Sequence, residues 1–341
     1  MGADHSTPSF TALADLASAR VGGRALAASD EFFAPKANLL KPELPVFIPD
    51  QFTTVGKWMD GWESRRRRTP GHDWCVIRLG MRGRISGVDV DTSYFTGNYP
   101  SHCSVDALDT SRAMTAELAS AEGPPWTEIL PATALRGDAH NYVALESPRA
   151  GQPWTHVRLN IHPDGGVARL HVYGEAVVDW NRIARNRRAV DLADIRLGGL
   201  VLGASDMHFG AKDNMIMPGR PKNMGDGWET RRRRGPGYDW ALVRLGASGM
   251  LKRIEIDTTH FKGNYPDSAS VEGCFAPGAT AVSLGSADWF EILPRTKLNP
   301  HHRHLFTREL RTDGLVSHVR LNIFPDGGIS RFRVYGFPAP S

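Results

Sequence analysis

The fifteen residues 60–74, DGWESRRRRTPGHDW, return almost unchanged at residues 226–240 as DGWETRRRRGPGYDW. The two stretches differ at three positions and begin 166 residues apart. Three shorter motifs repeat in the same order: residues 92–100 with 258–266, 128–131 with 291–294, and 156–166 with 318–328. A unit of roughly 140 to 155 residues is the size of a domain and is too long for a solenoid repeat. The sequence therefore predicts two similar domains.

The order of the motifs divides the chain into four parts. We expect an N-terminal tail at residues 1–19, a first repeat at 20–175, a linker at 176–195 and a second repeat at 196–337. The linker holds the main helical pattern, in which apolar residues recur among arginines.

The first repeat also carries an insert of about ten residues. Phe33 to Asp60 spans 27 steps, whereas the matching Phe209 to Asp226 spans 17. Long connections of this kind lie on the surface and often carry function. We expect a surface loop or a lid over a site.

Alternating apolar residues are typical of strands in both halves. Val157, Leu159 and Ile161 point one way from their strand, and alternation resumes after Pro-Asp-Gly-Gly at residues 163–166. We therefore expect each repeat to end in a hairpin of two antiparallel strands around that turn. Short strands with glycine and proline turns predict a sandwich of antiparallel sheets in each half.

Composition narrows the classes of function. The 341 residues are 41% hydrophobic with a net charge of +4, and no stretch has the apolar length of a membrane span. The first residues lack a secretory pattern and the three cysteines have no close pairing, so we expect reduced thiols and a cytoplasmic protein. No phosphate-binding or dinucleotide motif occurs, so we expect no redox cofactor. We also expect no nucleic-acid partner, because the arginine runs lie within motifs of aromatics and glycines.

The arginine runs are the first candidate binding residues. A guanidinium group binds a carboxylate through two parallel hydrogen bonds and stays charged at physiological pH, which predicts a small anionic ligand. The candidates are Arg65, Arg66, Arg67, Arg68, Arg231, Arg232, Arg233 and Arg234. The alternative is a structural network of ion pairs with nearby acids, which are Glu63, Asp73 and Asp91 in one repeat and Glu229, Asp239 and Asp257 in the other.

A second candidate site follows a strand in each repeat. Asp91 is followed by Gly-Asn-Tyr-Pro at residues 97–100, and Asp257 by the same motif at 263–266. Amide and carboxylate groups together satisfy both the donors and the acceptors of a ureido group. The candidates in these loops are Asn98, Tyr99, His260, Asn264 and Tyr265. The alternative is that the motif forms only a turn.

Histidines supply the third set. His140 lies in a loop whose counterpart, residues 299–304, holds His302. Either residue is a candidate general acid or base, or a metal ligand together with Glu63 or Asp91. The alternative is a solvated loop histidine. No spacing matches a strong zinc signature, so the metal is unknown, and a divalent ion stays open as a cofactor.

The repeated motifs carry a family resemblance. Each half resembles a galactose-binding or discoidin-type jelly roll, from its Asp-Gly-Trp opening to its Val-Arg-Leu-Asn-Ile-x-Pro-Asp-Gly-Gly finish. The pair resembles the allantoicase family, in which DGWE(S/T)RRRR, GNYP and EILP each occur twice, here over residues 20–337. The resemblance implies an all-β chain of two tandem jelly-roll sandwiches related by duplication.

The resemblance also implies an activity, in which allantoate and water become ureidoglycolate and urea in purine breakdown. Arginines would hold the substrate carboxylate, while Asp, Asn and Glu would hold its ureido groups. We hypothesise that Glu63 or His140 protonates the departing nitrogen and that Asp91 orients or activates the water. The matching Glu229, His302 and Asp257 would form a second site or complete a shared one.

Two other classes of function remain open. A non-catalytic jelly-roll module would bind a carbohydrate or another ligand through its loops. An assembly protein would use the arginine runs as interfaces, and a homo-oligomer is compatible with each of these functions.

Overall fold

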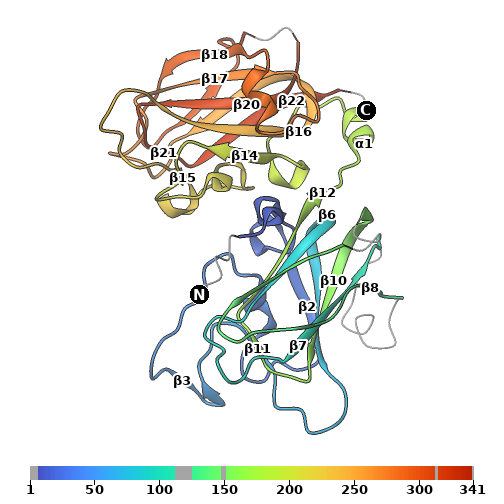
Figure 1. Cartoon of the computed structure of the whole chain (residues 1–341). Coiled ribbons are helices and arrows are strands. Elements are labelled where there is room, and N and C mark those ends of the chain that lie inside the picture. The colour runs from blue at the N-terminus through green and yellow to red at the C-terminus, as the bar shows by residue number, and fades with distance from the viewer. Residues whose placement is uncertain (1–6, 112–124, 147–150, 312–313, 340–341) are drawn as a thin grey trace. The chain divides into compact units, whose positions relative to one another are not determined.

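One strand of nineteen residues organises each half of the chain (Figure 1). In the computed structural model, which describes residues 7–111, 125–146, 151–311 and 314–339, these strands are β6 (Asp73–Asp91) and β16 (Asp239–Asp257). The chain divides into two units, Met1–Val177 and Val178–Ser341, each built around one of them. We call these units the first and second repeat.

Within its described residues, the first repeat is almost entirely β-structure, with three short 3₁₀ turns. Its main sheet has eight strands in the order β1-β12-β6-β10-β7-β8, with β2 and β9 also paired to β6. The other strands and the turns are β1 (Ala14–Asp15), β2 (Arg24–Ala28), β3 (Phe52–Thr53), β4 (Gly56–Lys57), β5 (Trp62–Glu63), β7 (His102–Leu108), β8 (Thr127–Ala134), β9 (His140–Ala144), β10 (Pro153–His162), β11 (Gly166–Val167), β12 (Arg169–Ala176), η1 (Ser9–Ala12), η2 (Ala19–Val21) and η3 (Lys36–Leu40).

The length of β6 has a structural reason. Its first half pairs with β2 and β10, with Val157 opposite Ile77, and its second half pairs with β9 and β12, with Leu170 opposite Val90. The strand exchanges partners midway, so both layers of an antiparallel sandwich share it. The predicted all-β sandwich is confirmed.

The second repeat has the same topology. Its sheet runs β13-β22-β16-β20-β17-β18, with β14 and β19 also paired to β16. The remaining elements are α1 (Trp180–Arg185), β13 (Val190–Asp191), β14 (Leu200–Ala204), β15 (Trp228–Glu229), β17 (Ser268–Cys274), β18 (Phe290–Lys297), β19 (Arg303–Phe306), β20 (Leu315–Phe324), β21 (Gly328–Ile329), β22 (Arg331–Pro338), η5 (Ile195–Leu197), η6 (Lys212–Ile216), η7 (Met224–Asp226) and η8 (Ser283–Ser286).

Both sheets take in short segments that precede the repeated motifs. β1 pairs with β12, so Ala14 and Asp15, from the stretch predicted as a tail, belong to the first sheet. β13 pairs with β22, so Val190 and Asp191, from the stretch predicted as a linker, belong to the second sheet. Helix α1 lies in that same stretch and begins where the Asp179 side chain accepts a hydrogen bond from the backbone N–H of Arg182.

The predicted terminal hairpin is wrong. β10 and β12 do not pair with each other, because β6 lies between them in the sheet. After the Pro-Asp-Gly-Gly turn, β11 pairs with β5 and carries the chain across β6. Gly166 is needed for close approach rather than for a hairpin, since a Cβ there would lie 1.9 Å from the Phe95 ring. The second repeat pairs β15 with β21 in the same way.

The repeated tryptophans anchor the core of each unit. Trp62 and Trp228 are fully buried, and each indole N–H donates to a backbone carbonyl, of Asp30 or Asp206, at 2.8 Å. The next residue along the chain is Glu63 or Glu229, so the core fixes the start of each glutamate backbone. Within the described residues, no helix has the length and apolar character needed to cross a membrane.

Candidate active site in the first repeat

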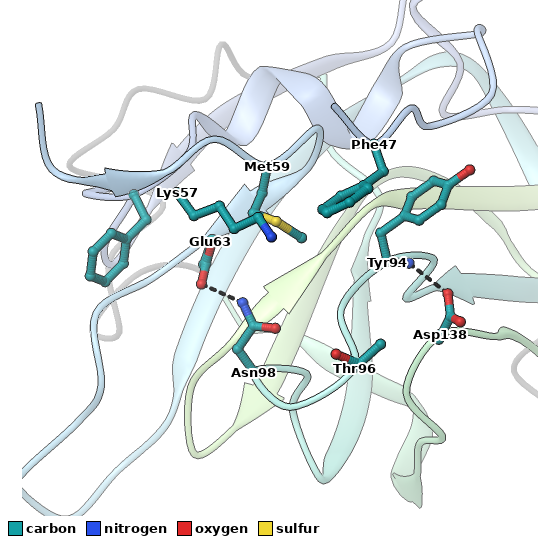
Figure 2. A pocket seen from close by; sticks show the side chains of 9 residues that line it. Phe47, Lys57, Met59, Glu63, Tyr94, Thr96, Asn98 and Asp138 are labelled. Atoms are coloured by element: carbon teal, nitrogen blue, oxygen red, sulfur yellow. Dashed lines mark hydrogen bonds between the residues drawn. The ribbon is translucent and has the colours of Figure 1, made fainter. Parts of the chain in front are cut away.

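A cleft of about 360 Å³ opens at the end of β5 in the first repeat (Figure 2). Ligand sites usually have this volume and this mixture of apolar walls with a few polar groups. Its lining residues are Phe33, Phe47, Lys57, Met59, Glu63, Tyr94, Thr96, Asn98 and Asp138. Of the sequence-predicted candidates, only Glu63 and Asn98 are in this lining.

Glu63 is held on both sides of its backbone. Its N–H and C=O bond with Ala34, and its strand pairs with β11 through Gly166. The carboxyl group accepts a hydrogen bond from the Asn98 amide at 2.7 Å. Burial raises the pKa of Glu63, and the Asn98 hydrogen bond offsets only part of that rise. Glu63 therefore keeps its proton to a higher pH than an ordinary glutamate.

The loop that carries Asn98 is fixed by the glycines of the Pro-Asp-Gly-Gly turn. The Gly166 N–H donates to the Asn98 carbonyl at 2.7 Å. A Cβ at Gly165 would lie 2.6 Å from that same carbonyl oxygen, and Gly165 has a φ of +137°. The two repeated motifs thus pack together and hold the Asn98 amide toward Glu63.

The opposite side of the cleft is built from residues outside the predicted set. Tyr94, at a left-handed φ of 69°, donates its backbone N–H to Asp138 at 2.8 Å. The Tyr94 ring stacks on Phe47, with ring centroids 5.7 Å apart. Figure 2 shows Glu63 and Asp138 on opposite sides of the cleft. Tyr94 lies in a repeated motif, whereas no repeated motif includes Asp138.

The insert of the first repeat supplies one wall. Phe47 lies in it, and the short strands β3 and β4 end at Lys57. The Lys57 amine lies 4.5 Å from the centre of the Phe47 ring. The sequence predicted a loop or lid here, and the insert lines the cleft.

The arginine run of the first repeat forms structural ion pairs, which was the alternative to binding a ligand. Arg65 pairs with Asp30 at 2.6 Å, and Arg67 pairs with Asp73 at 2.8 Å. Arg66 and Arg68 are exposed. In the described part of the chain, none of these four side chains lines the cleft. The second repeat does the same with its own run, since Arg231 pairs with Asp206 and Arg233 with Asp239, while Arg232 and Arg234 are exposed.

Asp91 and Tyr99 lie beneath the surface of the loop. The Asp91 side chain is fully buried and accepts hydrogen bonds from the N–H and hydroxyl of Ser93. Tyr99 packs on a cluster formed by Met59, Phe95 and Ala168. Neither belongs to the cleft lining in the described residues, so neither reaches a ligand bound there.

His140 begins β9 and is not among the described residues that line the cleft. Its Nδ1 is 2.7 Å from the buried Asp89 carboxylate, and its ring stacks on Tyr142. The predicted match with His302 is wrong. The register places His140 opposite Asp91 but Arg303 opposite Asp257, so Arg303 is the counterpart of His140.

The remaining second-repeat candidates form a different set of contacts. Glu229 accepts a hydrogen bond from the Asn264 amide, which repeats the Glu63 and Asn98 pair. His260, at the position of Tyr94, has the His301 ring edge-on beside it; its backbone N–H donates to His301 and its Nε2 lies 3.1 Å from the Pro221 carbonyl oxygen. The other predicted residues there are Asp257, which is fully buried, Tyr265, which is half-buried, and His302, which is exposed.

The donor groups do not suit a metal ion. Across the described ranges, no cluster of three or more His, Cys, Asp or Glu side chains is arranged to hold one. Glu63 has an amide partner and His140 a carboxylate partner, and these two candidates are not in one cluster.

Fold and cleft together define a class of protein. This is a tandem β-sandwich whose first repeat holds a small cleft with one carboxyl of raised pKa, a second carboxylate and an amine. Such a set is typical of an enzyme that acts on a small polar molecule.

Comparison with known proteins gives the family. The model of the allantoicase repeat matches residues 14–177 and 190–339. A probable allantoicase of Burkholderia mallei is 49% identical over 336 residues, which is 98% of this chain and 97% of that protein. One from Pseudomonas paraeruginosa is also 49% identical, over 99% of both. The chain belongs to the allantoicase family.

Solved structures agree with that assignment. A structure of allantoicase superposes with a TM-score of 0.81 at 34% identity and covers 95% of this chain and 93% of its own. The crystal structure of allantoicase from Saccharomyces cerevisiae gives a TM-score of 0.78 at 34% identity, with coverage of 95% and 92%. The predicted family and the duplicated fold are confirmed.

Proposed function

We propose that this chain hydrolyses allantoate to ureidoglycolate and urea, a step of purine breakdown, and that it does so in the cleft of the first repeat. Family membership over nearly the full length supports the reaction. The lining of the cleft supports the location, because the cleft combines a buried carboxyl, an amide and an amine.

The reaction sets the demands on the site. Allantoate carries one carboxylate and two ureido groups on a single carbon. Hydrolysis breaks the bond from that carbon to one ureido nitrogen and forms a bond to the oxygen of water. The departing nitrogen takes one proton, and the water loses one. A site for this reaction needs an acid, a base and a way to hold the anion.

Glu63 is the acid in this proposal, and its environment is the observation that carries the proposal. Burial raises its pKa, so the carboxyl stays protonated to a higher pH than that of an ordinary glutamate, and in that form it can donate to the departing nitrogen. The Asn98 amide, 2.7 Å away, fixes the direction in which the carboxyl points. A positioned general acid typically contributes about 10²- to 10⁴-fold to a rate.

Asp138 is the base in this proposal. It is the other carboxylate of the cleft lining, and one of its oxygens is already oriented by the Tyr94 N–H. Because it lies across the cleft from Glu63 (Figure 2), a water beside it would approach the carbon from the side opposite the leaving nitrogen. The proton from water passes to Asp138 while Glu63 gives up its own, so the protons balance.

A cytoplasmic location and self-association into a homo-oligomer are further parts of this proposal. The cysteines Cys75, Cys103 and Cys274 are buried free thiols, which supports a reducing compartment such as the cytoplasm. Cell fractionation tests this location. Self-association is tested by sedimentation of the purified protein.

The proposed reaction has a direct test. Purified protein incubated with allantoate should release urea and ureidoglycolate in equal amounts. Binding of a carbohydrate or another ligand without any urea release would favour the non-catalytic module instead.

A further inference from the structure

Among the described residues of the cleft lining there is one cation, and it lies in the segment that is longer in the first repeat. In the described part of the chain, Lys57 is the only Lys, Arg or His side chain among the lining residues. The arginines first expected to hold the substrate carboxylate lie elsewhere, with Arg65 and Arg67 already bound to Asp30 and Asp73. An anionic ligand in this cleft therefore meets Lys57 as its nearest possible counter-charge.

The Lys57 amine is available for a ligand. Within the described ranges it lies over the face of the Phe47 ring, 4.5 Å from the ring centre, and forms no ion pair with a carboxylate. Figure 2 shows the amine pointing toward the middle of the cleft. An ammonium group over an aromatic face is held in place but keeps its donors free for an anion.

Local structure fixes where the amine starts. Lys57 pairs with Phe52 in the β3–β4 hairpin, and the next residue, Trp58, donates its N–H to Gln51 at 2.9 Å. Three residues further on, the buried Asp60 is bound by Arg169 at 2.7 Å. The hairpin is thus tied at both ends, and Lys57 projects from a defined backbone.

The second repeat lacks this lysine. Counting back from the Asp-Gly-Trp motif, Asn223 occupies the position of Lys57. The Asn223 side chain caps the short turn η7 by accepting from the Asp226 N–H at 3.1 Å. The segment before Asp-Gly-Trp is about ten residues longer in the first repeat, and in the described part of the second repeat no hairpin like β3–β4 lies there.

We infer that Lys57 binds the carboxylate of the substrate and thereby selects ureido compounds that carry an acid group. This assignment rests on the proposed function of the cleft. With the carboxylate on Lys57, a ureido group extends toward Glu63 and Asn98, which offer an acid and an amide for it. Lys57 is a specificity-determining residue that takes no part in proton transfer.

The test separates charge recognition from catalysis. Binding of two inhibitors is measured by calorimetry: ureidoacetate, which has one ureido group and a carboxylate, and methylenediurea, which has two ureido groups and no carboxylate. Lys57→Gln should weaken ureidoacetate binding about ten- to a hundredfold, the range for a lost hydrogen bond to a charged group. Methylenediurea should bind the variant within about twofold of wild type. Lys57→Arg should recover most of the ureidoacetate affinity.

Controls make each outcome decisive. Lys222→Gln, an exposed lysine of the shorter segment in the second repeat, should bind both compounds as wild type does. Equal weakening of both compounds by Lys57→Gln, or no weakening of either, would overturn the inference, as would a wild-type protein that does not bind ureidoacetate. Failure of the proposed function has a separate signature, because it is the absence of urea release from allantoate by the wild type.

Discussion

Glu63 in the first repeat and Glu229 in the second bind the same asparagine partner, but different residues surround them. Around Glu63 lie Lys57, Tyr94 and Asp138, which complete a cleft. At the first two of these positions the second repeat has Asn223, which caps a turn, and His260, which contacts Pro221. The repeated residues alone therefore do not make a site.

The ion pairs at matching positions of the two sheets also differ between the repeats. In the first repeat, His140 pairs with Asp89 and His171 pairs with Asp15. At the same register positions of the second repeat, Arg303 pairs with Glu255 and Arg333 pairs with Asp191. The second repeat has arginines, which are always charged, where the first has histidines, whose charge depends on protonation.

The comparison separates the residues that build the scaffold of both repeats from the residues that form the cleft of the first. Residues shared by both halves, such as Trp62 and Arg67, build the scaffold through the core and through ion pairs. Residues that differ between the halves, above all Lys57 and Asp138, give the first repeat its chemistry. We expect substitutions of matching scaffold residues to have equal effects in the two halves. Substitutions of cleft residues should have an effect only in the first repeat.

The largest expected effect is a difference in kcat between variants of Glu63 and variants of Glu229. Glu63→Gln removes the proton donor while keeping the shape of the side chain, and should lower kcat for urea release about 10²- to 10⁴-fold. Glu229→Gln, the matched change, should stay within about twofold of wild type. An equal loss in both variants would show that both repeats are needed for the chemistry.

The next largest effect is a loss of stability, and it should be the same in both halves. Arg169 is buried and bonds to Asp60, whose pKa burial alone would raise but which the Arg169 and Lys41 hydrogen bonds hold below its usual value. Arg169→Met leaves that charge without its main partner, so the free energy of unfolding should fall by about 3–5 kcal/mol. Arg331→Met, which breaks the matching bond to Asp226, should cost a similar amount. Calorimetric unfolding measures both, and a loss confined to one variant would contradict a shared scaffold.

A smaller effect concerns the pH dependence of the reaction. The Asn98 hydrogen bond lowers the pKa of Glu63 against the larger effect of burial, which raises it. In Asn98→Ala that opposing contribution is gone, so the pKa should rise further and the fall in kcat with increasing pH should move to higher pH. The matched change Asn264→Ala should leave the profile unmoved. A shift toward lower pH would rule out Glu63 as the acid that sets this limb.

The smallest expected effect is on the pH dependence of stability, and it comes from the pair of His171 and Asp15 in the first repeat. Burial lowers the pKa of His171, but the Asp15 hydrogen bond and the charges of Asp15, Asp89 and Asp91 outweigh it and raise the pKa overall. Protonated His171 therefore stabilises the fold fully below its unfolded pKa near 6.5, and this contribution is lost as pH rises through the higher folded value.

Unfolding of wild-type protein should thus become easier as pH increases above about 6.5, by an amount that His171→Gln removes. Calorimetry at several pH values gives the comparison. His208→Gln, an exposed histidine of the second repeat, should keep the wild-type dependence. If His171→Gln keeps it too, another group is responsible.

The fold was largely predictable from the sequence, because duplication and alternating apolar residues both report on the scaffold. The hairpin predicted around residues 163–166 was wrong, because two strands that follow one another around a glycine turn have the local sequence pattern of a hairpin. Only the long-range insertion of β6 between β10 and β12 excludes it. The motif glycines were conspicuous, but their reason, contact with Phe95 and with the Asn98 loop, depends on tertiary structure.

The cleft was only partly predictable. Glu63 and Asn98 lie in repeated motifs and were identified, but the same criterion also selected the arginines, whose partners Asp30 and Asp206 lie more than twenty residues away in sequence. Lys57 and Asp138 carry no repeat signal, because the second half lacks them. The segment from Phe33 to Asp60, in which Lys57 lies, was the one available signal, as a difference in length between the halves.

A structure of the wild-type protein with ureidoacetate bound would decide where the ligand site is. The account predicts the ligand in the first-repeat cleft, with its ureido group against Glu63 and Asn98 and its carboxylate at Lys57. A ligand held by Arg66 and Arg68, or found beside Glu229 with the first-repeat cleft empty, would contradict it.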